Sequence, residues 1–195
     1  MKQIKLINAI SEAIIPLLGI FFFDWGLYFI LLFYFIDLIA TEVFIYLKVQ
    51  KIVQFQKIKF PFSTRFGRLI INSVLALILI ILSHLTVYFI VPNIDFASAF
   101  IEFLSYEEAG IPIPQGYILL PLVVLTNFQQ YKTTFIQSGV YRVTSWKDLI
   151  FSRRKALYIA ILGAVIAMLI ASFIAMPESI YVMLIVAVKI WVDLK

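Results

Sequence analysis

The segment Leu69–Val91 reads LIINSVLALILIILSHLTVYFIV and contains no Asp, Glu, Lys or Arg. A helix needs about 20 consecutive, mostly apolar residues to cross the hydrocarbon core of a bilayer. This segment has that length, and its few polar side chains can hydrogen-bond within or between helices. We therefore predict that it is a transmembrane helix.

Composition extends this prediction to the whole chain. Of its 195 residues, 63% are hydrophobic and 14% are charged, and the mean hydropathy is +1.03. A soluble domain of this length has too much surface for its volume to hide so much apolar area. We predict an all-α integral membrane bundle that forms a single transmembrane domain over residues 1–195. Its six stretches of suitable composition are about 7–23, 27–47, 69–91, 115–136, 156–175 and 179–193.

The charges alternate from one link to the next. Link 48–68 holds six basic residues and no acid, and link 137–155 holds five basic residues and one acid. Links 24–26, 92–114 and 176–178 hold acids and no Lys or Arg. Because Lys and Arg are enriched in cytoplasmic loops, this pattern predicts six crossings of the cell (inner) membrane with both termini inside. If one crossing were missing, the basic links would fall on both sides.

Two links are long enough to contain structure. In link 95–109, apolar residues recur at Phe96, Phe100, Phe103 and Leu104, which is the spacing of one helix face. We predict a short interfacial helix over about 95–109 on the outer side, capped by Asn93 or Asp95 and ended by Gly110. We expect the basic cytoplasmic links to lie against anionic lipid headgroups of the bilayer. A helix start is also predicted at Ser145, because Asp148 follows three residues later.

Charged side chains at membrane depth are costly and mark candidate functional sites. Asp37 lies ten residues into the second stretch, and Lys189 lies ten or eleven residues into the sixth, counted from the same outer side. At a rise of about 1.5 Å per residue, these residues reach the same depth. Asn127 of the fourth stretch does so too, and Thr41 lies one turn below Asp37. We predict that Asp37, Thr41, Asn127 and Lys189 form a polar cluster near the membrane midplane.

Two interpretations of this cluster remain open. In the first, Asp37 binds or relays a proton or a cation, and Lys189 tunes its charge. In the second, Asp37 and Lys189 form a buried ion pair that only fixes the packing of the helices.

Other polar residues are secondary candidates. Glu42 lies near the inner boundary, within reach of Lys48, Arg65 or Arg68, where a structural role is expected. His84 lies between Ser83 and Thr86 and is either a hydrogen-bonded packing residue or a ligand.

The residue inventory argues against most enzymes. The chain has no Cys and one His, so disulfides, thiolate metal sites and the usual catalytic triads are not expected. It contains no H-E-x-x-H, no G-x-S-x-G and no P-loop. We expect no enzymatic activity, no cofactor and no metal. The net charge of +5 is explained by the cytoplasmic links, so we expect no nucleic-acid partner.

Both ends of the chain carry recurring motifs. The first third holds Pro16-x-x-Gly19 and Phe23-x-Trp25, and the chain closes with Lys189 followed by Asp193-Leu194. These motifs resemble those of an uncharacterised bacterial family of small multi-pass membrane proteins, known as a domain of unknown function. The resemblance implies no activity. It implies that Gly19, Trp25, Asp37, Lys189 and Asp193 form one recurring set, although the amide that accompanies the family's acid is missing beside Asp37.

Three functions remain open from the sequence, and an enzyme that acts on lipids is the one least favoured by the motifs. The midplane cluster favours a small-solute or ion transporter or channel. The alternative is a non-catalytic membrane subunit or scaffold that associates with partner proteins, and the small size of the bundle would also suit a homo-oligomer.

Overall fold

The structure, a computed structural model, describes residues 14, 16–23, 25–59, 62–107 and 115–194, without the side chains of 62–65, 115 and 192–194. All regular elements in these ranges are helices, and no strand occurs among them. The predicted all-α class is therefore confirmed for the described residues. A short helical stretch at 16–22 precedes the labelled helices. These are α2 (Leu27–Phe55), α3 (Phe62–Ile90), α4 (Phe96–Ser105), α5 (Gln115–Gln130), α6 (Trp146–Phe173) and α7 (Glu178–Leu194).

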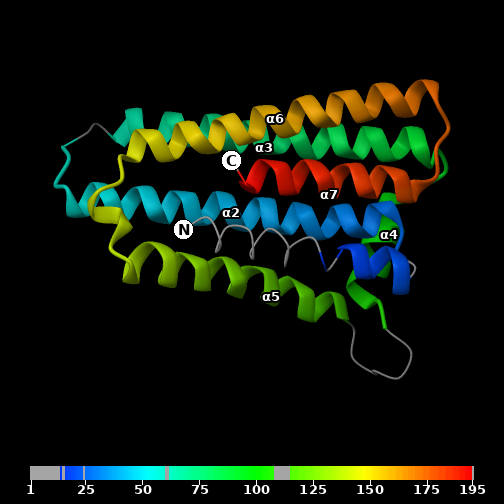
Figure 1. Ribbon diagram of the computed structural model, residues 1–195, viewed down its shortest axis with the longest axis horizontal. Helices are drawn as coiled ribbons and strands as arrows, with labels where there is room; N and C mark the ends of the chain where they lie inside the picture. Colours follow the sequence, from blue (N-terminus) through cyan, green and yellow to red (C-terminus); the bar gives the residue numbers. More distant parts are fainter. Residues whose placement is uncertain (1–13, 15, 24, 60–61, 108–114, 195) are drawn as a thin grey trace.

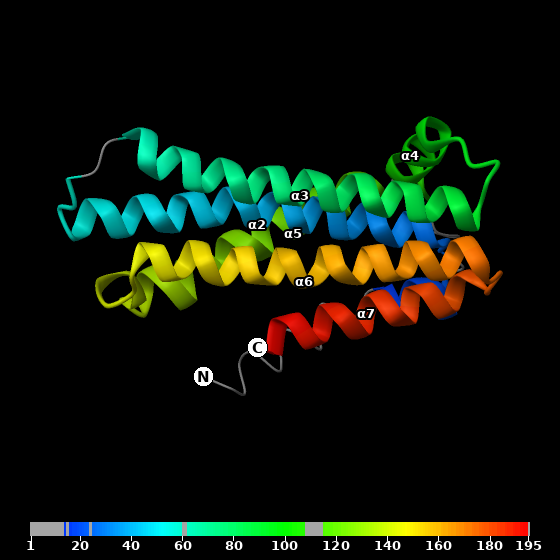
Figure 2. The same cartoon turned by 90° about the horizontal axis from the view of Figure 1, so that it is seen from above.

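The long helices lie roughly along one axis, with α2, α5 and α7 running in one direction and α3 and α6 in the opposite direction (Figure 1). Helices α3 and α6 pack on each other and lie on one side of α2, with α5 on the other side (Figure 1). Helix α7 contacts both α2 and α6, and Figure 2 shows it beside α6. The C-terminal end of α2 and the N-terminal ends of α3 and α6 lie together at one end of the bundle, which we call the basic end (Figure 1). The α6–α7 turn and α4 lie at the opposite, acidic end. The basic and acidic links of the sequence are thus separated in space.

Three helical segments among the described residues are long and apolar enough to cross a membrane. They are Leu27–Phe55, Phe66–Ile90 and Trp146–Phe173. Helix α5 is shorter but continues as a π-helix over Tyr131–Gln137, so that the combined element covers the predicted 115–136 stretch. Helix α7 has 17 residues.

Several helices extend beyond the predicted bilayer boundaries. Helix α2 continues to Phe55 instead of ending near residue 47, and α6 begins at Trp146 instead of near residue 156. No Gly or Pro interrupts either extension, and Lys and Arg are good helix formers whose long side chains can reach the headgroups. Ser145 occupies the predicted N-cap position, but its side chain makes no capping hydrogen bond.

Helix α2 is the centre of the bundle, because α3, α4, α5, α6 and α7 all contact it. Two large clusters of buried side chains surround it. The outer cluster, at the acidic end, includes Leu27, Phe103 and Tyr181. The inner cluster, at the basic end, includes Val49 and Ile150. Asp37, Thr41 and Glu42 of α2 lie between these clusters.

Helix α4 forms where a surface helix was predicted. The Asp95 carboxylate accepts hydrogen bonds from the backbone N–H groups of Ala97 (3.0 Å) and Ser98 (3.3 Å), which is a standard N-cap. Phe103 is buried, but Phe100 of the same predicted face is 43% exposed. The helix lies on α2 and α5, so the core covers only part of that face. Gly110, the predicted stop, lies outside the described residues.

Candidate functional site

The structure brings together the residues of the predicted midplane cluster. Asn127 Nδ2 donates to Asp37 Oδ1 at 2.9 Å, and Lys189 Nζ lies 3.7 Å from Asp37 Oδ2. Thr41 Oγ1 donates to Asn127 Oδ1 at 3.3 Å. Helices α2, α5 and α7 therefore meet in a network centred on the Asp37 carboxylate, which we call the midplane cluster. That this network is a functional site stays a prediction.

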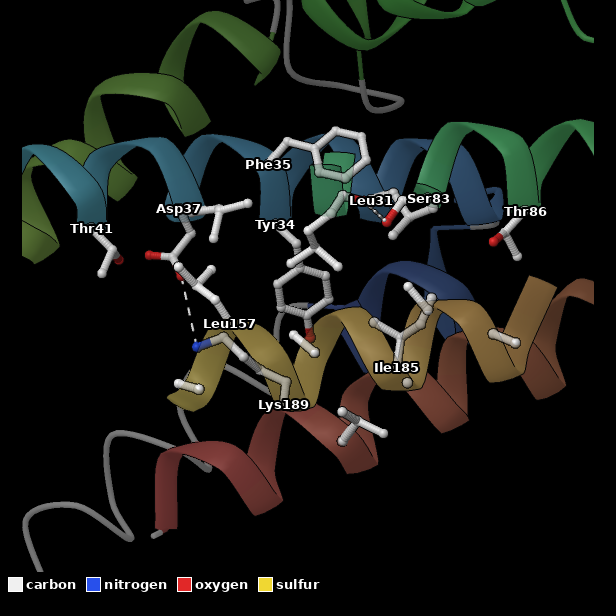
Figure 3. A pocket seen from close by; sticks show the side chains of 18 of the residues that line it. Leu31, Tyr34, Phe35, Asp37, Thr41, Ser83, Thr86, Leu157, Ile185 and Lys189 are labelled. Carbon is white, nitrogen blue, oxygen red and sulfur yellow. Dashed lines mark hydrogen bonds and ion pairs between the residues drawn. The ribbon is translucent and has the colours of Figure 1, made fainter. Parts of the chain in front are cut away.

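Local geometry explains how these groups converge. Asp37 and Thr41 are four residues apart on α2 and lie on the same side of that helix. Asn127 Nδ2 also donates to Val123 O of its own helix at 3.1 Å, which fixes the orientation of the amide. The amide oxygen is then left to accept from Thr41. Lys189 extends from α7 past Leu157 to reach Asp37 (Figure 3).

The midplane cluster lines a long cavity of about 440 Å³ between α2, α3, α5, α6 and α7. Figure 3 shows Asp37 and Lys189 facing each other beside the apolar side chains of Leu31, Phe35 and Ile185. The side chains of Asp37 and Lys189 remain 19% and 27% exposed. Pockets of 300–1,000 Å³ with apolar walls and a few polar groups are the usual form of small-molecule sites.

The basic end of the cavity contains residues that the sequence did not single out. Lys48, Gln130 and Arg153 line it there. Arg153 Nε lies 2.6 Å from Glu42 Oε1, and their side chains are 18% and 13% exposed. Glu42 was expected to lie within reach of Lys48, Arg65 or Arg68, but its described ion-pair partner is Arg153. Because α6 begins near residue 146, Arg153 already lies on the helix, beside Glu42.

His84 is held in a polar and aromatic environment. Its Nδ1 lies 2.8 Å from the Ile80 carbonyl oxygen, which can only accept, so Nδ1 is the donor. Its Nε2 lies 3.1 Å from the Tyr28 hydroxyl. The ring stacks on Phe35 with centroids 5.2 Å apart. Both ring nitrogens thus have protein partners, which is the arrangement of a packing histidine.

The remaining candidates contribute less to the site. Asp193 lies on α7, but its side chain is outside the described residues. Gly19 and Trp25 of the N-terminal motif are in contact, since Trp25 N donates to Gly19 O at 2.9 Å and a side chain at Gly19 would collide with the indole. No group of three His, Asp or Glu residues that could hold a metal occurs in the described part of the chain.

Comparison of the sequence and the fold with protein-family models, curated proteins and solved structures finds no match. The resemblance at the two ends of the chain therefore gains no support. Function has to be argued from the midplane cluster and its cavity.

Proposed function

We propose that the chain is an inner-membrane protein with six crossings and both termini inside, and that it transports a small solute or an ion. The spatial separation of the basic and acidic links supports this topology, because Lys and Arg mark the cytoplasmic end. In this orientation the basic end contacts anionic lipid headgroups. The extended helices α2 and α6 then project into the cytoplasmic headgroup region.

The observation that carries the transport proposal is the position of Asp37. It is a carboxylate on the central helix, between the two large core clusters, and it lines a cavity shared by α2, α3, α5, α6 and α7. Ionisable residues at membrane depth that face a cavity typically belong to ion or proton pathways. The carboxylate can exchange its long contact with Lys189 for a proton or a cation while Asn127 continues to hold it.

The two intramembrane ion pairs differ in a way that supports this assignment. The Arg153–Glu42 pair is short, at 2.6 Å, whereas the Lys189–Asp37 pair is 3.7 Å long. A short charge-assisted hydrogen bond is the stronger of the two interactions. We therefore assign Arg153–Glu42 to packing and Asp37–Lys189 to the exchange of ions.

Ion flux in proteoliposomes tests the proposal. Purified protein is reconstituted with internal pyranine, and a potassium gradient with valinomycin sets the membrane potential. Proton entry is then followed with and without a sodium gradient. We expect flux from the native protein and a loss of at least tenfold in Asp37→Asn. The matched control is Thr126→Val, because Thr126 is exposed and bonds only within its own helix.

Two outcomes would contradict the proposal. One is native protein that passes neither ion, and the other is equal flux in native protein and folded Asp37→Asn. Stoichiometric co-purification of a second membrane protein in mild detergent, together with absent flux, would instead support the scaffold alternative.

A further inference from the structure

The charges around the cavity do not cancel at its basic end. Lys189 is paired with Asp37, and Arg153 is paired with Glu42. Lys48 also lines the cavity, yet no carboxylate in the described residues lies within ion-pair distance of its Nζ. Its described contact is with the ring of Phe135, whose centroid lies 5.9 Å away. The basic end of the cavity therefore carries one positive charge in excess among the described residues.

A second donor at the same end lacks a partner. Arg153 Nη2 is buried and makes no hydrogen bond to any described residue. A buried donor without a partner costs about 1–3 kcal/mol, and more when it is charged. Arg153 is also a like-charged neighbour of Lys48. An anionic group between these two side chains would satisfy the free donor and cancel the excess charge.

The shape of the cavity indicates what the rest of such a ligand looks like. The lining extends along α2 from Leu27 to Lys48, which at about 1.5 Å per residue is roughly 30 Å. A volume of about 440 Å³ over that length makes a narrow channel and not a broad chamber. Beyond the midplane cluster its walls are largely apolar, with Leu31, Phe35 and Ile185 along them (Figure 3).

We propose that the cavity binds a single-chain amphiphile with one anionic headgroup. The headgroup, a carboxylate or a phosphate, lies between Lys48 and Arg153, and Gln130 supplies a further amide donor. The acyl chain runs past Asp37 toward the acidic end of the bundle. This inference rests on the proposed function in that it names the class of solute for the same cavity.

Equilibrium binding of tritiated oleate to purified, delipidated protein in mild detergent tests the inference. We expect saturable binding that unlabelled oleate and a lysophosphatidate displace. Oleyl alcohol and oleylamine, which have the same chain with a neutral or a cationic head, should compete at least tenfold less well. A tenfold difference in affinity corresponds to 1.4 kcal/mol. If the lysophosphatidate does not displace the label, the headgroup is assigned to the carboxylate class; if it displaces the label at a lower concentration than unlabelled oleate, the headgroup is assigned to the phosphate class.

Two variants locate the headgroup. Lys48→Gln should weaken oleate binding at least tenfold, and Arg153→Lys should weaken it while keeping the charge that pairs with Glu42. The matched control is Lys51→Gln, one turn further along α2, where the ammonium lies 5.6 Å from the Tyr141 ring and does not line the cavity. Equal binding by Lys48→Gln and native protein, or equal competition by oleyl alcohol, would overturn the inference. An equal loss of oleate affinity in Lys48→Gln and Lys51→Gln would show that oleate binds at the basic surface outside the cavity, which would also overturn the inference.

The result of the oleate-binding experiment can be distinguished from the result of the ion-flux experiment. Asp37→Asn should bind oleate as the native protein does, because Asp37 is not part of the headgroup site. Flux that depends on Asp37 without oleate binding would refute this inference alone. Oleate binding that depends on Lys48 without proton or sodium flux would refute the ion exchange assigned to Asp37 and leave this inference standing.

Discussion

The pairing of Asp37 with Lys189 predicts a measurable energetic coupling between two helices. At an effective dielectric constant of about 20, unit charges separated by the 3.7 Å of this pair attract each other by ~4 kcal/mol. The cost of removing both groups from water, and their partial exposure, reduce the net value. We expect a coupling energy of about 2 kcal/mol from a double-mutant cycle.

The cycle uses Asp37→Asn, Lys189→Met and the double variant. Lys189→Met leaves a half-buried carboxylate with Asn127 as its described hydrogen-bond donor, so we expect a loss of about 3 kcal/mol in the free energy of unfolding. The double variant should lose about 2 kcal/mol less than the sum of the single variants. Unfolding is measured by SDS titration in mixed micelles, followed by tryptophan fluorescence.

Additivity would refute the reasoning. If the double variant equals the sum of the singles within about 0.5 kcal/mol, the two residues are not coupled. The charge swap Asp37→Lys with Lys189→Asp gives a second check, since it should be more stable than either single reversal. Thr126→Val combined with Lys189→Met is the control cycle, for which we expect additivity.

Three further predictions concern the scaffold around the site. Asn72→Leu should lower the free energy of unfolding by about 2 kcal/mol in the same SDS titration, because the buried amide accepts from Arg154 Nε at 3.1 Å and donates to the Ile150 carbonyl. Gly116→Val should cost about 1–3 kcal/mol in that titration, since even a Cβ at this position would collide with the Phe103 carbonyl oxygen of α4 and lie 2.6 Å from Leu104 Cα. Hydrogen bonds, first from the Ser98 side chain and then from the backbone N–H groups of Ser98 and Ala97, hold the pKa of Asp95 below its usual value. The Asp95 cap therefore contributes its full stability to α4 above about pH 3.8, the pKa of the unfolded chain. This stability is lost as the pH falls through the lower pKa of the folded state. Amide hydrogen exchange of α4 should therefore accelerate on acidification relative to an Asp95→Asn reference, whose cap does not titrate.

The depth of each residue of the midplane cluster along its helix could be predicted from the sequence. The direction in which its side chain points around the helix axis could not. The positions of Asp37, Asn127 and Lys189 within their apolar stretches set their heights along the bundle, because the helical rise per residue is constant. Helix α2 is apolar on all sides, so its sequence does not indicate which face contacts α6. The contacts of the midplane cluster therefore needed the packing of the helices to be known.

The residues at the basic end of the cavity were missed for a specific reason. The apolar stretches predicted from the sequence end near residue 47 and begin near residue 156, so they place Lys48 and Arg153 in cytoplasmic links. Both links are helical at these positions, so both side chains line the cavity. The signal was present in the sequence, since neither extension contains a helix-breaking residue.

The way α7 is attached gives the ion pair a mechanical consequence. At the acidic end, Glu178 accepts the Leu27 backbone N–H at 2.9 Å, and Tyr181 and Val182 are buried in the outer cluster. Toward the basic end, the charged contact of α7 with α2 is Lys189–Asp37. A helix that is anchored at one end and carries a reversible ion pair toward the other can shift about its anchored end when that pair opens, as alternating access requires. Neutralising Asp37 would release that second contact, whereas the Arg153–Glu42 pair would keep α6 on α2. In the proposed transport cycle, we therefore expect α7 to move relative to α2.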